Sequence, residues 1–171
     1  MKASIVLTVI GPDRPGLVEA LSETVAEHGG NWEEGRMAHL DGQFAGLLRV
    51  VVDGSKLAGL EAALAKLPGL SVTSTAGGAT ANDSDPRYTL SVLGQDREGI
   101  VRELAHALAR QGVNVEELGS SCESAPMSGE TLFRATAKLR IPSTASLDEL
   151  REQLESIGDD LMVDVSLTPV D

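Results

Sequence analysis

A short loop, Gly11–Gly16 (Gly-Pro-Asp-Arg-Pro-Gly), carries the residues most able to do chemistry in this chain of 171 residues. Asp13 supplies a carboxylate that can neutralise an ammonium group, and Arg14 supplies a guanidinium that can hold a carboxylate through two hydrogen bonds. Glycine at position 16 leaves room for a ligand to approach the backbone N–H groups at the start of a following helix. Together these groups suit a free amino acid.

The loop occurs twice in the chain. The second copy, Gly94–Gly99, reads Gly-Gln-Asp-Arg-Glu-Gly, and the shared residues are displaced by a constant 83 positions: Gly11, Asp13, Arg14 and Gly16 return as Gly94, Asp96, Arg97 and Gly99. Glu98 of the second copy adds a negative charge where a ligand carboxylate would lie. We therefore expect the first loop to be the better binding site.

The residues around each loop predict the element order β-α-β-β-α-β. In the first half, apolar runs predict strands at 3–10, 31–40, 43–52 and 70–75, with an Asp-Gly hairpin turn between the second and third. One helix is marked by Leu17, Leu21 and Val25. The other is marked by a leucine stripe from 57 to 67, and we expect Ser55 to cap it.

The second half repeats this order. Its first helix carries Ile100, Leu104 and Leu108, again displaced by 83, and its second helix begins at Ser146, which with Glu149 forms a capping box. Residues 121–129 are expected to lengthen the hairpin turn. We predict an α+β fold of two ferredoxin-like modules, 1–76 and 87–171, joined by a linker at 77–86; each module has an antiparallel four-stranded sheet with two helices on one face.

Composition excludes several classes of function. The net charge of −12 repels nucleic-acid backbones, and 2% aromatic residues provide few stacking platforms, so we expect no direct DNA or RNA binding. Cys122 is the single cysteine, which rules out an internal disulfide. Because Met1–Ile10 is too short for a signal peptide or a membrane span, we expect a cytoplasmic protein without a membrane partner. No catalytic motif and no metal-ligand spacing is found, so we predict no enzyme activity and no cofactor.

The loop, the helix after it and the following His28-Gly-Gly-Asn31 resemble the ACT domain family, twice over nearly the whole chain. The tandem arrangement, without a catalytic domain, resembles glycine cleavage system transcriptional repressors. The resemblance implies that a small ligand, often an amino acid, binds at an interface between modules, near the first loop and the start of the second strand. It marks these candidate ligand-binding residues: Gly11, Asp13, Arg14, Gly16, Leu17 and Asn31, and Asp96, Arg97, Gly99 and Asn114.

Each candidate also has a purely structural interpretation. Asp13 and Asp96 could cap the helices that follow them, and Asn31 could simply form a turn after a helix end. We predict a non-catalytic regulatory protein, a homodimer, that binds an amino acid such as glycine or serine and modulates a protein partner such as a transcription regulator. The alternative is a module that serves oligomerisation and binds no small ligand.

Overall fold

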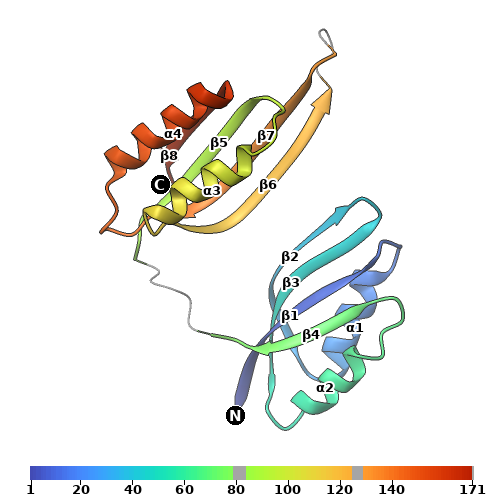
Figure 1. Ribbon diagram of the computed structural model, residues 1–171. Coiled ribbons are helices and arrows are strands. Elements are labelled where there is room, and N and C mark those ends of the chain that lie inside the picture. Colours follow the sequence, from blue (N-terminus) through green and yellow to red (C-terminus); the bar gives the residue numbers. More distant parts are fainter. Residues whose placement is uncertain (79–83, 125–128, 171) are drawn as a thin grey trace. The chain divides into compact units, whose positions relative to one another are not determined.

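The computed structural model describes residues 1–78, 84–124 and 129–170, and the chain divides into two compact units, 1–80 and 81–171 (Figure 1). We call them the first and second modules. Residues 79–83 of the predicted linker lie outside the described residues.

The first module is a four-stranded antiparallel sheet with strand order β2-β3-β1-β4, and two helices lie against one face of it (Figure 1). β1 and β3 are the central strands, whereas β2 and β4 are the edges. The elements follow the predicted order: β1 Lys2–Pro12, α1 Leu17–Glu27, β2 Asn31–Leu40, β3 Gln43–Asp53, α2 Leu57–Leu64 and β4 Ser71–Ala76.

The second module repeats this topology with strand order β6-β7-β5-β8. Its elements are β5 Arg87–Gln95, α3 Ile100–Arg110, β6 Asn114–Ser124, β7 Thr131–Arg140, α4 Leu147–Leu161 and β8 Val163–Pro169. The predicted α+β, ferredoxin-like fold is thereby confirmed for both modules.

Each core is mainly aliphatic, with Phe133 buried in the second, and its residues follow the alternation of the strands and the four-residue spacing of the helices. In the first module, alternate residues of β1 meet the four-spaced stripe of α1, and all of them are buried: Ile5, Leu7, Val9, Leu17, Leu21 and Val25. Full burial of one such side chain contributes about 1.5–3 kcal/mol relative to exposure. Burial of these six side chains therefore contributes more to the packing of α1 on the sheet than the helix propensity of its residues does.

Three details of the predicted elements differ from the structure. Ser121–Ser124 continue β6, paired with Thr131–Arg134 of β7, and do not form a turn. α2 ends at Leu64, before Leu67, because Leu67 precedes Pro68 and a residue before proline disfavours the helical conformation. Ser55 does not cap α2: its backbone N–H and its hydroxyl both donate to the carboxylate of Asp53.

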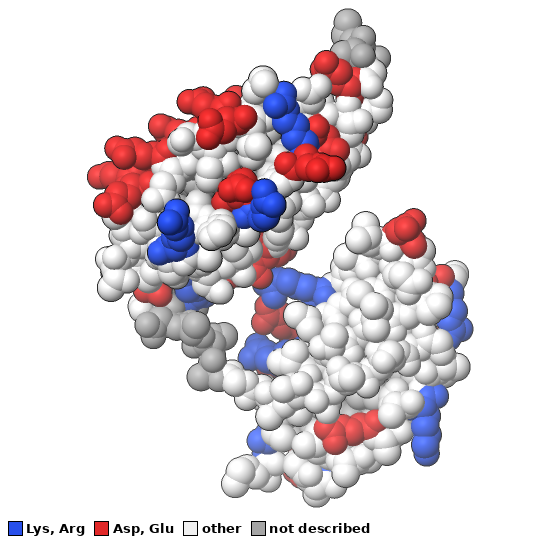
Figure 2. Space-filling model, viewed as in Figure 1, with Lys and Arg blue, Asp and Glu red and all other residues white. Residues whose placement is uncertain are grey.

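The capping residue predicted for α4 is confirmed, since Ser146 Oγ accepts a hydrogen bond from the Glu149 N–H at 3.3 Å. Acidic side chains gather along this helix (Figure 2): Asp148, Glu149, Glu152, Glu155, Asp159 and Asp160. A surface of this sign disfavours contact with a phosphate backbone.

Candidate functional site

The two Asp-Arg loops occupy equivalent places, between the end of a central strand and the start of a helix. In the first module the Asp13 N–H donates to the carbonyl of Gly42, in the hairpin turn between β2 and β3, at 2.9 Å. In the second module the Asp96 N–H donates to the carbonyl of Thr131, at the start of β7, at 2.8 Å. Each loop is therefore fixed against the neighbouring hairpin.

The aspartates do not cap the helices. The N-cap residues of α1 and α3 are Gly16 and Gly99, with φ of 88° and 93°, and neither helix has a side-chain cap. This left-handed conformation favours glycine, which explains why both loops end in it. The capping interpretation of Asp13 and Asp96 is wrong, and the Asp13 carboxylate, 40% exposed, stays accessible to solvent.

A second residue faces each loop aspartate. His39 Nε2 lies 3.8 Å from Asp13 Oδ2, and it accepts a hydrogen bond from the Gly42 N–H at 3.1 Å. At the equivalent position of β6, Cys122 contacts Asp96; partial desolvation, and then the charge and hydrogen bond of Asp96, raise the pKa of the Cys122 thiol.

These two partners were not identified from the sequence, because the histidines and Cys122 were tested there for metal-ligand spacing and Cys122 for a disulfide, and not for contact with the loop aspartates. They are separated by 83 residues, the same displacement as the loops themselves. That displacement was the available signal.

The two loop arginines differ in their contacts. Arg14 Nη2 donates to the carbonyl of Pro68 at 2.5 Å, so this guanidinium joins the loop to the turn that precedes β4. Arg97 lies 3.5 Å from Gln95 Oε1 and 3.5 Å from Met162 Sδ, which are longer contacts. Arg97 is therefore the more available of the two for an anionic ligand.

Gly11, Gly94 and Leu17 have structural roles. A Cβ atom on Gly11 would lie 2.1 Å from the carbonyl oxygen of Gly69, and one on Gly94 would lie 2.7 Å from that of Met162. Both glycines therefore allow the connection from the second helix to the last strand to approach the central strand. Leu17 is 3% exposed and belongs to the core.

The structure does not bring Asp13 and Asn31 together within the first module. Asn31 pairs with Val51, which pairs with Ser4, whereas the loop follows Pro12. The eight residue steps of β1 from Ser4 to Pro12 span roughly 26 Å at the rise of a β-strand. In the second module Asn114 pairs with Arg140, which pairs with Arg87, so it is equally far from the loop after Gln95.

Residues 3–69 match the ACT domain family model. A solved structure of an unknown protein from Galdieria sulphuraria is 31% identical in sequence, with a TM-score of 0.88 and 100% of each chain covered. The chain belongs to the ACT domain family. A protein assigned as a glycine cleavage system transcriptional repressor shares the tandem ACT fold, at 20% identity and a TM-score of 0.71 over 100% of this chain and 99% of that one. No curated protein matches the sequence.

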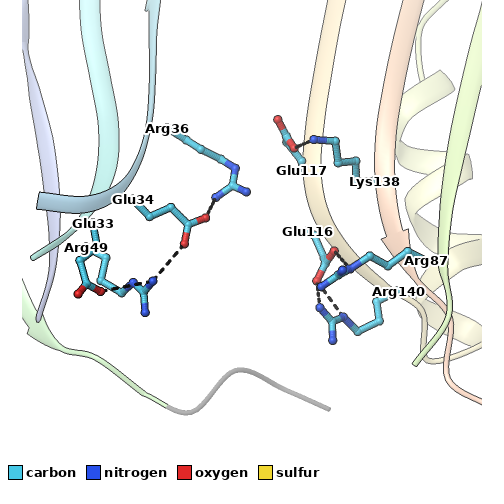
Figure 3. Close-up of polar contacts among 9 residues, drawn as sticks. All are labelled: Glu33, Glu34, Arg36, Arg49, Arg87, Glu116, Glu117, Lys138 and Arg140. Carbon is cyan, nitrogen blue, oxygen red and sulfur yellow. Dashed lines mark hydrogen bonds and ion pairs between the residues drawn. The ribbon is translucent and has the colours of Figure 1, made fainter. Parts of the chain in front are cut away.

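Both ACT modules carry a polar cluster at the start of the edge strand (Figure 3). A β-bulge occurs there in each module, between Trp32 and Glu34 in β2 and between Val115 and Glu117 in β6. In the first module the carboxylates of Glu33 and Glu34 lie 3.5 and 3.7 Å from Arg49 Nη2. This cluster is largely exposed.

In the second ACT module the bulge residue Glu116 lies between two arginines. Its Oε1 accepts hydrogen bonds from Arg140 Nε and Nη2 at 2.8 and 2.5 Å, and its Oε2 lies 3.6 Å from Arg87 Nε (Figure 3). The Arg140 side chain is only 7% exposed. This ion pair offsets the buried positive charge of Arg140, whereas the Arg87 side chain is 53% exposed and Asn114, the first residue of β6, is also exposed.

Among residues 1–78, 84–124 and 129–170, no group of three or more His, Cys, Asp or Glu side chains is placed to hold a metal ion. Within the same described ranges, no helix has the length and apolar composition needed to cross a membrane.

Proposed function

We propose that this tandem ACT protein is a non-catalytic regulator that binds a small amino acid on its Asp-Arg loops. The observation that carries the proposal is the Asp13 carboxylate, which is exposed, fixed through its backbone to Gly42, and not used for helix capping. A carboxylate in this position neutralises a ligand ammonium, and the N–H groups of the first turn of α1 receive the ligand carboxylate.

The second half of the site comes from another module. Because Asp13 and Asn31 lie at opposite ends of one sheet, a small ligand contacts only one of them within a module. β2 and β6 are edge strands, and antiparallel pairing of two such edges puts the start of one beside the end of the other. A loop aspartate then faces the asparagine of the paired module, whether that module belongs to the same chain or to a second copy.

We expect the first loop to bind glycine and serine. This loop has no acidic residue at the position where the second loop has Glu98. Occupancy changes the function of the protein only if the ligand binds two states of the module pair with different affinity. A partner that recognises one state, such as a transcription regulator or an enzyme of amino-acid metabolism, then responds to the concentration of the amino acid.

Isothermal titration of the full chain against the twenty amino acids tests the proposal, with the fluorescence of Trp32 as a second readout. We expect glycine or serine to bind, Asp13→Asn to weaken this binding at least about tenfold, and Asp41→Asn, on the nearby hairpin turn, to leave it unchanged. The absence of any heat or fluorescence change with all twenty amino acids would overturn the proposal.

One observation favours the alternative, a module that serves assembly alone. All eleven residues of edge strand β6, each taken as a whole residue, are exposed, and a long open edge pairs readily with another strand. The oligomeric mass of Asp13→Ala distinguishes the two functions. Loss of the oligomer, together with no response of the wild-type protein to any amino acid, favours assembly.

A further inference from the structure

The helices of the second module cover only one face of its sheet (Figure 1). α3 and α4 pack against the face that carries Leu90 and Val92 of β5, both buried in the core. The alternate residues of the same strand, among them Ser91 and Leu93, lie on the opposite face. Because residues that pair across neighbouring strands share a face, the strand register identifies the other side chains on this open face.

A row of three residues with opposite charges at its two ends crosses the open face. Leu93 of β5 pairs with Arg134 of β7 on one side and with Asp164 of β8 on the other. We call these three residues the charged row. The Cα atoms of the arginine and the aspartate are two strand spacings apart, about 10 Å. Leu93 lies between them and is 36% exposed.

Both charges of this row are available to a partner. Arg134 and Asp164 are exposed, and neither side chain forms a hydrogen bond or an ion pair with another residue of the described ranges. The other cations of β7, Lys138 and Arg140, lie 2.6 and 2.5 Å from carboxylates of β6. The charged row therefore presents one positive and one negative charge that the module itself does not compensate.

Small side chains beside the charged row leave a hollow in the open face. In the neighbouring row, Ser91 pairs with Thr136 on one side and with Ser166 on the other. These three residues and the charged row line a hollow of about 260 Å³. The hollow provides space for side chains that project from a facing surface.

The first module has no charged row at the equivalent place. Ile10 occupies the position of Leu93, displaced by 83 residues, and it pairs with Ala45 and Ser71, which are both uncharged. The charged row is therefore a feature of the second module and not of the fold that the two modules share.

We propose that the open face of the second sheet binds the same face of a second copy of the chain. A two-fold axis that runs along β5, between the Leu93 side chains of the two copies, exchanges the positions of β7 and β8. Arg134 of each copy then faces Asp164 of the other, and the two ion pairs flank two leucines whose apolar surface is removed from water. Sheets that pack face to face keep their strand directions within about 30° of each other, which this axis permits.

The symmetry of the charged row favours a second copy over any other occupant. A two-fold interface requires that a residue and its counterpart meet in reciprocal pairs, and opposite charges at equal distances from a central leucine meet this requirement. An axis across the strands would instead place Arg134 against the same arginine of the other copy, which is unfavourable. The charges therefore also determine how the two sheets are oriented.

The size of the open face indicates a weak dimer. Four strands about 4.8 Å apart, with the nine residues of β5 at about 3.4 Å each, give a sheet area of roughly 500–600 Å². Stable interfaces bury about 800 Å² on each partner. We therefore expect the fraction of dimer to depend strongly on protein concentration.

Sedimentation equilibrium of the full chain over a range of concentrations measures this association. We expect Arg134→Glu and Asp164→Arg each to weaken it by about tenfold or more, because two attractive contacts are replaced by two contacts between like charges. An equimolar mixture of the two variants should associate like the wild-type protein, since a row with two acidic ends then faces a row with two basic ends.

Arg110→Glu and Glu152→Arg are the matched controls. They change the net charge by the same amounts as the two test variants, at exposed positions of α3 and α4, which cover the other face of the sheet. Both controls should associate like the wild-type protein. Circular dichroism checks that all four variants fold, and recovery of association in the mixture checks it independently for Arg134→Glu and Asp164→Arg.

Three outcomes would overturn this inference. The first is a wild-type chain that stays monomeric into the millimolar range, and the second is an association that neither Arg134→Glu nor Asp164→Arg weakens. The third is a mixture of two weakened variants that does not recover, which would show that the charged row does not face its own copy. Because the inference does not depend on amino-acid binding, each of these failures leaves the proposed function intact.

Discussion

Cys122 and Asp96 are in contact at the end of β6, and His39 and Asp13 form the equivalent pair at the end of β2, with 3.8 Å between Nε2 and Oδ2. In each module the edge strand therefore presents one side chain to the aspartate of the loop. Because Cys122 is exposed and is the only cysteine, its chemistry reports directly on the charge at Asp96.

The first prediction concerns the reactivity of Cys122. The desolvation and the negative charge that raise the thiol pKa reduce its thiolate fraction at a given pH below that of an ordinary cysteine. Replacing Asp96 by Asn removes the charge, so the pKa falls and alkylation by iodoacetamide at pH 8 accelerates several-fold. The measurement is the alkylation rate of Cys122 between pH 7 and 10. The pH dependence of this rate in the variant should have the shape of the wild-type curve and be displaced to lower pH.

Glu123→Gln is the matched control, because it removes one negative charge beside Cys122 without touching the Asp96 contact. Its alkylation curve should stay close to that of the wild-type protein. Equal displacement of the curve by both variants would show that general negative charge, rather than the Asp96 contact, sets the reactivity.

The second prediction concerns the close approach at Gly11 and Gly94. A methyl group at either position meets backbone atoms, which cannot rotate away. We expect Gly11→Ala and Gly94→Ala each to destabilise its module by about 1–3 kcal/mol, or more at Gly11, where the clash is closer. Urea unfolding measures this loss.

Gly119→Ala is the control for these glycine variants. No atom lies within 4 Å of a Cβ atom built on Gly119. Its stability should therefore stay within about 0.5 kcal/mol of the wild-type value. A comparable loss in all three variants would contradict the role assigned to the close approach.

The fold could be predicted from the sequence because both of its periodicities are strong. Alternating aliphatic residues in β1 and the four-spaced stripe Leu17, Leu21 and Val25 specify one strand and one helix that share a core. The displacement of 83 residues then transfers these two assignments to the second module. Because the cores contain few aromatic residues, these two patterns of aliphatic residues are easy to recognise in the sequence.

The candidate site was harder to predict. Two residues that are near each other in sequence can lie far apart in space when a helix connects the strands that carry them. The chain passes from Asp13 through α1, which returns it along the sheet, so Asn31 begins at the opposite end. The second module also contains an apolar cavity between α3 and the sheet, whose lining includes Ala137 and Val115, and such side chains meet only after strands pair in a register displaced by a bulge. Nothing in one segment of the sequence shows that combination.

The third prediction concerns the ion pair of Glu116 with Arg140. Because the Arg140 side chain is 7% exposed, loss of the Glu116 charge leaves part of a buried positive charge uncompensated. We expect Glu116→Gln to destabilise the second module by on the order of 2 kcal/mol, given that Glu116 itself is 28% exposed. Urea unfolding at pH 7 gives this value.

Glu117→Gln tests whether burial causes the effect. The partner of Glu117, Lys138, is 62% exposed and Glu117 is 44% exposed, at an N–O distance of 2.6 Å (Figure 3). An exposed pair of this kind contributes about 0–1 kcal/mol and weakens with added salt. Similar losses from Glu116→Gln and Glu117→Gln would contradict the prediction.

The fourth prediction concerns acid dependence at the start of α2. The hydrogen bonds from the Ser55 side chain and backbone hold the pKa of the Asp53 carboxyl below its ordinary value of 3.8. A carboxyl with a depressed folded-state pKa stabilises the fold above its unfolded-state pKa, and this contribution disappears as the pH falls through the folded-state pKa. Ser55→Ala should therefore lower the urea midpoint at pH 7, and the difference from the wild-type protein should shrink as the pH is taken well below 3.8. A difference that stays constant over this range would show that Ser55 stabilises the module by some means other than its hydrogen bonds to the Asp53 carboxylate.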